Sequence, residues 1–550
     1  MRITVNNLKF NIEHEPDDAR IAGTIARQLN IPVSDVSDIE IRKRSIDARH
    51  KNNICFVYSV DCDIRGLRRL PESGRLNIGP AGHIKYELPQ NDGLSSYQGR
   101  PVVIGAGPAG LFCAYILVEA GLSPIIIERG MDVDTRRADV DEFWNLGILK
   151  PDSNVQFGEG GAGAFSDGKL NTLVHDRAGR CRFVLETFVM FGAPANILYD
   201  SRPHVGTDIL MDVIRNMRDY MIMRGAEFRF NSRVTGIVPG KGAGRYIAGV
   251  TVEDSDGSYQ IGSDRVILAI GHSARDTFQM LYDSGVDLSA KPFAVGLRVE
   301  HPRRFIDISQ YGVHGADILP AAPYKLTSQT ESGRGVYSFC MCPGGYVVNA
   351  SSEPGMLAVN GMSYSGRNGE NSNSAIIVTV TPEDYPSDHP LAGVEFQRTL
   401  ERRAYEAGNG AIPVQTFKDY AAQCGVNISR SEGSITVRLP EGIAGYGPAS
   451  KGSYVETDIS GILPMNLNGC IIEGMMNFDR NIRGFADLCV YLSGVESRTS
   501  SPVRIERDAR GESVSIRGLY PCGEGAGYAG GITSAAMDGM YIAEQVIAAI

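Results

Sequence analysis

The feature that most constrains this chain is a glycine motif set between two short apolar runs. Residues 100–104 form an apolar run typical of a strand, and glycines at Gly-x-Gly-x-x-Gly spacing follow directly at 105–110. Residues 111–120 have the composition of a helix, 124–127 form a second apolar run, and Glu128 ends it. Strand, glycine motif, helix, strand and acid in this order predict a βαβ unit that binds a dinucleotide.

Each position of the motif has a physical role. Gly105 permits a tight turn, Gly107 lets the backbone approach a pyrophosphate, and Gly110 allows the helix and strand to pack closely. The helix N-terminus offers amides and positive potential to the phosphates, and Glu128 is placed to accept hydrogen bonds from an adenosine ribose. We therefore expect the dinucleotide to contact Gly105, Gly107, Pro108, Ala109, Gly110, Glu128 and Arg129.

Two later segments decide between NAD and FAD. Residues 265–271 form an apolar strand that ends in glycine, and 518–535 hold a strand, a glycine-rich turn and the start of an apolar helix. This pairing resembles flavoproteins of the glutathione-reductase-like class, in which the second segment contacts the ribityl chain and the flavin pyrimidine edge. The resemblance implies FAD, held in part by Gly271, Gly523, Glu524, Gly531 and Ile532. Glu524 stands where that class usually has Asp.

A third glycine-rich stretch lies at residues 157–170. One interpretation is a flexible glycine loop. Many flavoproteins of the same class run such a stretch beside the cofactor, which here implies backbone contacts from Gly160, Gly161 and Gly163. Ser166 or Lys169 would then face the flavin or the substrate.

Five segments together resemble one family. Residues 165–170, 202–208, 271–276, 360–364 and 522–527 look like those of a bacterial family of FAD-dependent dehydrogenases of unknown substrate. The resemblance covers essentially the whole chain. It implies the cofactor and leaves the reaction open.

The order of the patterns predicts an α/β fold in several parts. Strand and helix patterns in the order β-α-β-β indicate a small α+β N-terminal module over residues 1–97. A discontinuous FAD-binding Rossmann-like domain would comprise 98–290 and 485–550. Strand-like runs with one helical stretch at 393–407 indicate an inserted, mostly antiparallel α+β domain over 291–484, on the substrate side.

A flavoprotein of this layout is expected to be an oxidoreductase that moves a hydride between flavin N5 and a small or medium organic substrate, because the flavin ring carries the redox chemistry. Weak candidates for a catalytic role are His204, His272, Lys169, Cys340 and Cys342. His204, with Arg202, could bind an anionic substrate or cap a helix near Asp208. Lys325, Tyr337 and Tyr364 could line a pocket, with no ground for ranking them.

The cysteine pair admits two interpretations. Cys340 and Cys342 could form a redox-active dithiol, but the Cys-x-x-Cys or Cys-x4-Cys signature beside the glycine motif is absent, so ordinary buried cysteines are the default. Two thiols without a matching His/Cys pair predict no metal site. No second Gly-x-Gly-x-x-Gly is present, which argues against a dedicated NAD(P)H domain. NAD(P)H stays open as a transient electron donor that binds at the flavin face.

Net charge, hydropathy and cysteine content limit the partners and the cellular location expected for this chain. The net charge of −10 argues against nucleic acid, although Arg42-Lys43-Arg44 keeps an FAD-dependent RNA-modifying enzyme as an alternative, with a non-catalytic flavin sensor as another. No apolar run approaches the roughly 18–20 residues that span a bilayer, and the N-terminus lacks the layout of a secretory signal. Ten cysteines without a disulfide framework fit a reducing cytoplasm. The substrate and the oligomeric state stay open.

Overall fold

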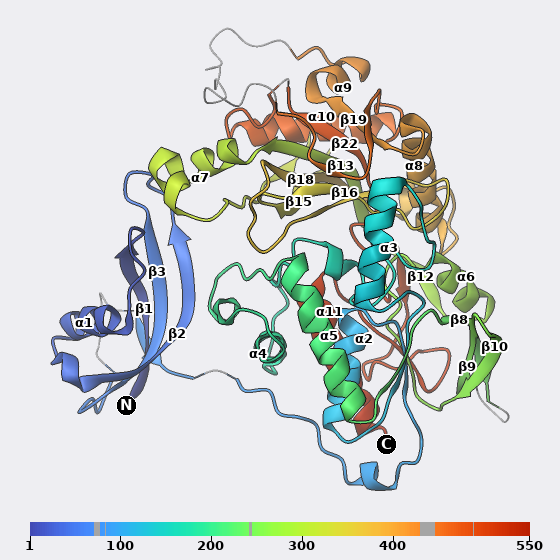
Figure 1. Cartoon of the computed structure of the whole chain (residues 1–550), viewed down its shortest axis with the longest axis horizontal. Helices are drawn as coiled ribbons and strands as arrows, with labels where there is room; N and C mark the ends of the chain where they lie inside the picture. Colours follow the sequence, from blue (N-terminus) through green and yellow to red (C-terminus); the bar gives the residue numbers. More distant parts are fainter. Residues whose placement is uncertain (71–76, 83, 241–244, 429–445, 488) are drawn as a thin grey trace.

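The computed structural model of the chain contains several sheets flanked by helices (Figure 1). It describes residues 1–70, 77–82, 84–240, 245–428, 446–487 and 489–550.

The N-terminal module is a four-stranded sheet covered by one helix. Its strand order is β2-β3-β1-β4, and its elements are β1 (Arg2–Asn11), α1 (Asp18–Leu29), β2 (Val36–Asp47), β3 (Cys55–Ile64) and β4 (Ile78–Pro80). Burial alternates along β1, where Ile3, Val5, Leu8 and Phe10 point inward. The side chain of Asp17 caps α1 by accepting a hydrogen bond from the Arg20 amide at 2.8 Å. The predicted β-α-β-β order is confirmed for these elements.

The module is joined to the rest of the chain at two places. The Arg44 amide donates to the Tyr199 carbonyl at 2.7 Å, and the Ser201 amide donates to the Arg44 carbonyl at 2.8 Å. The apolar core of the module also continues into that of the largest sheet through Ile54 and Tyr311. The module therefore shares a core with its neighbour, whereas the sequence pattern suggests a separate unit.

A five-stranded parallel sheet carries the glycine motif. Its order is β24-β11-β5-β6-β7, with β5 (Val102–Ile104), β6 (Ile125–Ile127), β7 (Glu227–Arg229), β11 (Val266–Leu268) and β24 (Leu519–Pro521). The helices of this part are α2 (Pro108–Glu119), α3 (Val133–Leu146), α4 (Arg180–Met190), α5 (Thr207–Met223), α6 (Arg275–Asp283) and α11 (Ile532–Ala548). Strands from both ends of the chain thus meet in one sheet.

Helix α2 is central to this part. It follows β5 directly and packs against α11, and its residues from 109 to 118 are buried (Figure 1). The helices touch closely at Gly539, where a Cβ would lie 2.1 Å from the Ala109 carbonyl oxygen. Two smaller units lie alongside: β8 (Arg233–Pro239), β9 (Ile247–Asp254) and β10 (Gly257–Gly262), and the pair β12 (Leu288–Ala290) with β23 (Val503–Ile505).

The largest sheet has seven strands in the order β14-β15-β18-β13-β22-β19-β21. They are β13 (Phe293–Pro302), β14 (Thr327–Gln329), β15 (Gly335–Cys342), β18 (Asn371–Val380), β19 (Ile412–Thr416), β21 (Tyr454–Glu456) and β22 (Tyr491–Glu496). All pairs are antiparallel except β19 with β21. The remaining elements are α7 (Arg303–Ile318), β16 (Tyr346–Asn349), β17 (Val359–Met362), α8 (Ala392–Gly408), α9 (Phe417–Gln423), β20 (Ser450–Lys451) and α10 (Met465–Asp479).

One strand lies in a different part from that predicted. β22 pairs with β13 and β19 inside the largest sheet, although the sequence analysis assigns residues 485–550 to the FAD-binding domain. Local alternation shows that a strand exists but not which strand it pairs with. The other predicted domain boundaries stay predictions.

Candidate functional site

A cavity of about 340 Å³, open to solvent, runs along the carboxyl ends of β5, β6 and β11. One end, which we call the nucleotide end, is lined by Gly105, Gly107, Glu128, Arg129, Ser232 and Arg233. The other, which we call the substrate end, is lined by Lys169, Phe339, Cys340, Asn360 and Glu496. This volume lies within the roughly 300–1,000 Å³ of ordinary ligand pockets, and the lining residues extend from the nucleotide end to the substrate end. An extended ligand fits this shape.

The three motif glycines differ in what surrounds them. Gly105 has φ +100°, and a Cβ there would lie 2.3 Å from the Ala269 carbonyl oxygen. A Cβ on Gly110 would lie 1.9 Å from the Gly105 oxygen. A Cβ on Gly107 would meet only the Gly161 Cα at 3.7 Å, an ordinary contact. The fold itself therefore requires Gly105 and Gly110, whereas the space at Gly107 belongs to the cavity.

Two helices point their N-termini at this cavity. Gly107 is the N-cap of α2 and Gly531 that of α11, and no side chain of the described residues caps either helix. Pro108 and Ile532, the first residues of the two helices, line the cavity. Uncapped helix N-termini present amides and positive potential to an anion. Together with the space at Gly107, this arrangement fits the pyrophosphate of a dinucleotide.

Glu128 is buried beside the phosphate loop. Its Oε2 accepts a hydrogen bond from the Ala106 amide at 2.8 Å, and its Oε1 accepts from the Gly130 and Gly158 amides at 2.9 and 3.0 Å. A carboxylate has about four acceptor positions, so Oε2 retains one for a ribose hydroxyl. Glu128 therefore also fixes the loops around it, a role that the motif alone does not reveal.

The glycine-rich stretch is held by an arginine that the sequence analysis missed. Arg136, from α3, is fully buried and donates hydrogen bonds to five backbone carbonyls, those of Asn154, Val155, Gly158, Glu159 and Gly161, at 2.7–3.2 Å. Burial lowers the pKa of Arg136 to about 10. This stretch is therefore an anchored wall of the cavity and not a loose loop.

At the substrate end, the buried carboxylate of Asp167 forms ion pairs with two cations. Asp167 lies 3.5 Å from the Lys169 ammonium and accepts from Arg367 and from the Ser363 hydroxyl. Although burial opposes it, the charges of Lys169 and Arg367 hold the pKa of Asp167 below its usual range. His204 lies beside the Asp167 carbonyl, and its Nε2 has no hydrogen-bond partner within the described part of the chain. Burial first, and the charge of Arg367 second, lower the pKa of His204.

His272 and Glu524 both line the cavity and lie next to each other, with 3.8 Å between the imidazole Nδ1 of His272 and Oε1 of Glu524. Burial, with the charges of Arg498 and Arg275, lowers the pKa of His272 to about 3, so its ring is neutral at pH 7. Burial raises the pKa of Glu524 to about 7, against the opposing charge of Lys291. The pair therefore offers a neutral imidazole and a carboxyl that holds its proton about half of the time at pH 7.

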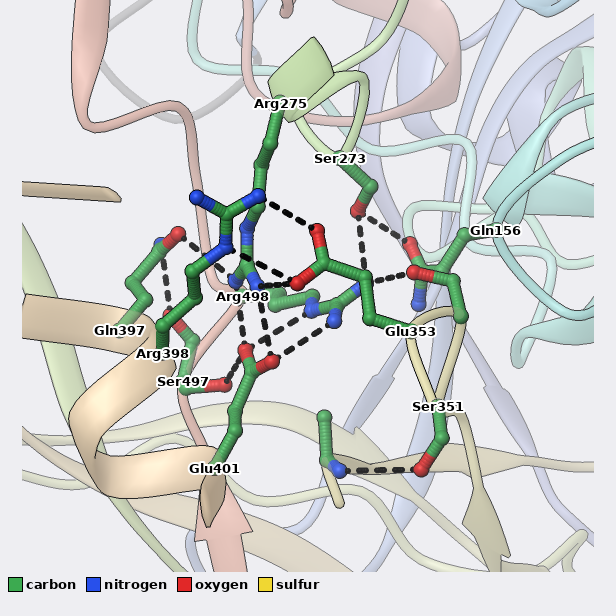
Figure 2. A network of polar contacts seen from close by, with 12 residues as sticks. Gln156, Ser273, Arg275, Ser351, Glu353, Gln397, Arg398, Glu401, Ser497 and Arg498 are labelled. Carbon is green, nitrogen blue, oxygen red and sulfur yellow. Dashed lines mark hydrogen bonds and ion pairs between the residues drawn. The ribbon is translucent and has the colours of Figure 1, made fainter. Parts of the chain in front are cut away.

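A buried ion network lies next to the cavity, and Gln156, Ser273 and Arg498 of this network line it (Figure 2). Glu401, on α8, accepts from Arg275 at 2.7 and 2.9 Å and from Arg498 at 2.8 and 2.9 Å. Arg498 lines the cavity and also donates to the Ser273 hydroxyl at 3.3 Å, which donates to Gln156 at 2.9 Å. The network connects α6, α8 and the residues after β22, so it joins the largest sheet to the part that carries the glycine motif.

The cavity brings most of the sequence-predicted residues together. Those that line it are Gly105, Gly107, Pro108, Ala109, Glu128, Arg129, Gly161, Gly163, Ser166, Lys169, Gly271, His272, Cys340, Glu524, Gly531 and Ile532. Gly110, Gly160, His204, Cys342 and Gly523 are outside its lining. Neither His204 nor Arg202 caps α5, since its N-cap Gly206 has no side-chain partner among the described residues and Arg202 instead donates to the Pro323 carbonyl.

Comparison with known proteins gives the family. The family model described as "FAD-dependent protein, C-terminal domain-like" matches residues 292–499, and a domain of unknown function matches 2–63. An uncharacterized protein from Clostridium beijerinckii is 43% identical over 552 residues, with 100% of this chain and 99% of that protein covered. The chain belongs to this family of FAD-dependent proteins. FAD is therefore the cofactor, as predicted, and the chain is a flavin-dependent oxidoreductase in the broad sense.

Solved structures are more distant. The 3-ketosteroid delta1-dehydrogenase from Sterolibacterium denitrificans is 10% identical, with 82% of this chain and 100% of that chain covered and a TM-score of 0.35. A triple mutant of the flavin-dependent brominase Bmp2 is 12% identical, with 82% and 81% covered and the same TM-score. Similarity this low carries no argument about activity.

The described residues lack two kinds of feature. None of their helices combines the length and the apolar character needed to cross a membrane. Nor do they contain a group of three or more His, Cys, Asp or Glu side chains that could hold a metal ion.

Proposed function

We propose that the chain moves a hydride between flavin N5 of bound FAD and a small or medium organic substrate, as a dehydrogenase or reductase of the glutathione-reductase-like class. The observation that supports this proposal is that one continuous cavity has two chemically different ends. The nucleotide end contains the glycine motif and the helix N-termini, and the substrate end is built mainly from the largest sheet. The flavin supplies the redox chemistry, and the chain supplies binding and orientation.

Backbone groups would hold most of the cofactor. The phosphates would lie at Gly107, Pro108 and Ala109, the adenosine ribose at Glu128, and the ribityl chain at Glu524. Gly161 and Gly163 would run beside the flavin, because Arg136 fixes their loop at the cavity wall. Exposed backbone amides at these places would recognise FAD with little need for side chains.

The substrate end would orient the other reactant. Lys169 is the accessible cation there, with 34% of its side chain exposed, and Asn360 offers an amide. Phe339 supplies an apolar surface. His272 would donate or accept a hydrogen bond as a neutral ring, while Glu524 could hold or release a proton near neutral pH.

The RNA-modifying alternative is less well supported. Arg44 donates to Asp200 at 2.7 and 3.0 Å, and Arg42 donates to Glu40 at 3.0 Å. Two of the three basic residues that motivated this alternative are therefore engaged within the chain. RNA binding that is lost on deleting residues 1–97 would revive it.

Gly107 provides the sharpest test of the cofactor site. In Gly107→Val the side chain would fill space that the fold leaves free, so the protein should fold but purify with less than a tenth of the wild-type FAD. Gly461→Val is the matched control, because Gly461 also has no close neighbour and lies in an exposed turn. FAD content from visible absorbance and folding from circular dichroism are the measurements. Wild-type FAD occupancy in Gly107→Val would refute the placement.

The reaction itself can be tested by anaerobic flavin bleaching. NADH, NADPH and pooled metabolites are added separately to the FAD-loaded protein, and the oxidised flavin absorbance is followed. We expect at least one donor to bleach the flavin. A flavin that exchanges electrons with no donor and no acceptor, oxygen included, would favour the sensor alternative.

A further inference from the structure

Cys340 occupies an irregular position at the substrate end. It lies on β15, whose register with β18 shifts between Phe339 and Cys342, so the strand carries a bulge there. Its φ is +45°, a conformation that residues other than glycine rarely adopt. Bulges next to active sites redirect side chains. Here Cys340 lines the cavity, while its neighbours Met341 and Cys342 are buried.

The charged groups around this thiol include two cations, Lys169 and Arg298, and two carboxyl groups, Glu496 and Glu524. Glu496 pairs with the buried Arg298 at 2.9 Å, so these two charges offset each other. Burial raises the pKa of Glu524, which reduces its negative charge near neutral pH. Lys169 lies 3.5 Å from Asp167, which also pairs with Arg367. The positive charge of Lys169 favours an anion at the thiol.

Cys342, a buried thiol two residues along the chain, contacts Cys340. Its thiol donates to the Cys340 carbonyl at 3.2 Å, and Arg298 donates to the same oxygen at 3.3 Å. The pKa of Cys340 is lowered by a hydrogen bond that the Cys342 thiol can make to the Cys340 sulfur in place of the carbonyl, and then by the charges of Lys169 and Arg298. Burial raises the pKa of Cys342. The two thiols are therefore unequal, and Cys340, which lines the cavity, ionises more readily than the buried Cys342.

We propose that Cys340 is a nucleophilic thiolate that exchanges with small-molecule disulfides entering the substrate end of the cavity. The Cys340 sulfur attacks one sulfur of the disulfide, a bond forms between them, and the disulfide bond breaks. The leaving thiolate takes a proton from solvent, so the step needs no reactant besides the disulfide. This covalent chemistry goes beyond hydride transfer and depends on no particular hydride donor.

Other cysteines provide the contrast. Burial raises the pKa of Cys113, which lies in the core of the FAD-binding part and outside the cavity lining. Thiols of that kind are inert. Cys489 is exposed and serves as the internal reference for an accessible thiol.

The first test labels the FAD-loaded protein with iodoacetamide from pH 5 to 9, with each modified cysteine quantified by mass spectrometry. Lowering a thiol pKa increases the thiolate fraction but weakens each thiolate as a nucleophile, so the pH profile is more informative than the rate. We expect Cys340 labelling to level off below pH 8, while an ordinary thiol, with a pKa of about 8.5, continues to gain. A Cys340 profile that rises through pH 9 with that of Cys489, or no labelling of Cys340, would overturn the proposal.

Two variants of Lys169 separate charge from packing. Lys169→Gln removes the positive charge and should move the Cys340 profile to higher pH, whereas Lys169→Arg keeps the charge and should leave it within a few tenths of a pH unit. Flavin absorbance and circular dichroism show whether both variants remain folded and loaded. Identical profiles for the two variants would contradict the role of the charge.

The second test uses 2-hydroxyethyl disulfide as the probe. In Cys342→Ser, where the serine hydroxyl still donates a hydrogen bond, we expect the mixed disulfide on Cys340 to form at least tenfold faster than on Cys489 at pH 6.5. Cys340→Ser should lose that adduct and keep the one on Cys489. An adduct on Cys489 alone would reject the exchange chemistry, and because FAD content is measured separately, it would leave the proposed hydride transfer untouched.

Discussion

At the scale of single residues, burial decides the chemistry of the cavity more than residue type does. His272 and Glu524 lie 3.8 Å apart, yet burial makes the imidazole neutral and leaves the carboxyl close to half-protonated at pH 7. Sequence shows that these residues are near the cofactor segments. It cannot show their protonation, because that depends on the charges that other elements bring to them, Arg498 and Lys291 among them.

The raised pKa of Glu524 predicts a pH-dependent stability. Between the pKa of an unfolded glutamate, about 4.3, and about 7, the native state holds a proton that the unfolded chain releases, so stability falls as pH rises. We expect FAD-free wild type to lose about 3 kcal/mol relative to Glu524→Gln between pH 4 and pH 8. Urea unfolding of both proteins at several pH values measures this difference. If the unfolding free energies of the two proteins change in parallel with pH, the pKa of Glu524 is not raised in the native state.

At the scale of elements, the sequence predicts what local pattern controls. The βαβ unit, the C-terminal strand and helix and the strands of the N-terminal module lie where the periodicity places them. The substrate end was not predictable in the same way: Asn360, Glu496 and Arg498 come from separate segments that meet only through sheet pairing. Nor could the carbonyl contacts of Arg136 be foreseen, since nothing in its helix distinguishes it from a surface arginine.

The packing of α2 against α11 gives a prediction at this scale. Gly539→Ala would place a methyl group 2.1 Å from the Ala109 carbonyl oxygen, so the helices must separate, at a cost of about 1–3 kcal/mol. Because Ala109 lines the cavity, FAD affinity should fall as well. Gly469 is the control, because it lies within α10 on the solvent-exposed face and a Cβ there would meet nothing within 4 Å. Gly469→Ala should therefore stabilise the protein by about 0.5–1 kcal/mol. Thermal unfolding and FAD titration of the pair test this; equal effects would disprove the close contact.

At the scale of the whole molecule, the buried network around Glu401 connects parts that are far apart in the sequence (Figure 2). Glu401→Gln would remove the carboxylate that Arg498 pairs with and leave Arg275 only its pair with Glu353 at 3.3 Å, and we expect a loss of about 3–5 kcal/mol. Glu395→Gln in the same helix breaks only the exposed pair with Arg398 and should cost less than about 1 kcal/mol. The midpoints of denaturant unfolding distinguish the two variants. Similar midpoints for Glu401→Gln and Glu395→Gln would mean that the network contributes little to stability.

Acid should weaken the same connection. Despite its burial, the charges of Arg275 and Arg498 hold the pKa of Glu401 below its usual range, so the stabilisation is present above the pKa of an unfolded glutamate and is lost as pH falls below it. The wild type should therefore lose more stability than Glu401→Gln between pH 5 and pH 2.

The five-stranded sheet has a consequence for biosynthesis. Its edge strand β24 and the helix α11 come from the other end of the sequence from β5 and α2, and both pairs border the same cavity. A growing polypeptide on the ribosome therefore exposes the glycine motif long before it can retain flavin. During that interval β11 lacks its partner β24, so its backbone donors and acceptors form an unpaired edge that can pair with another chain.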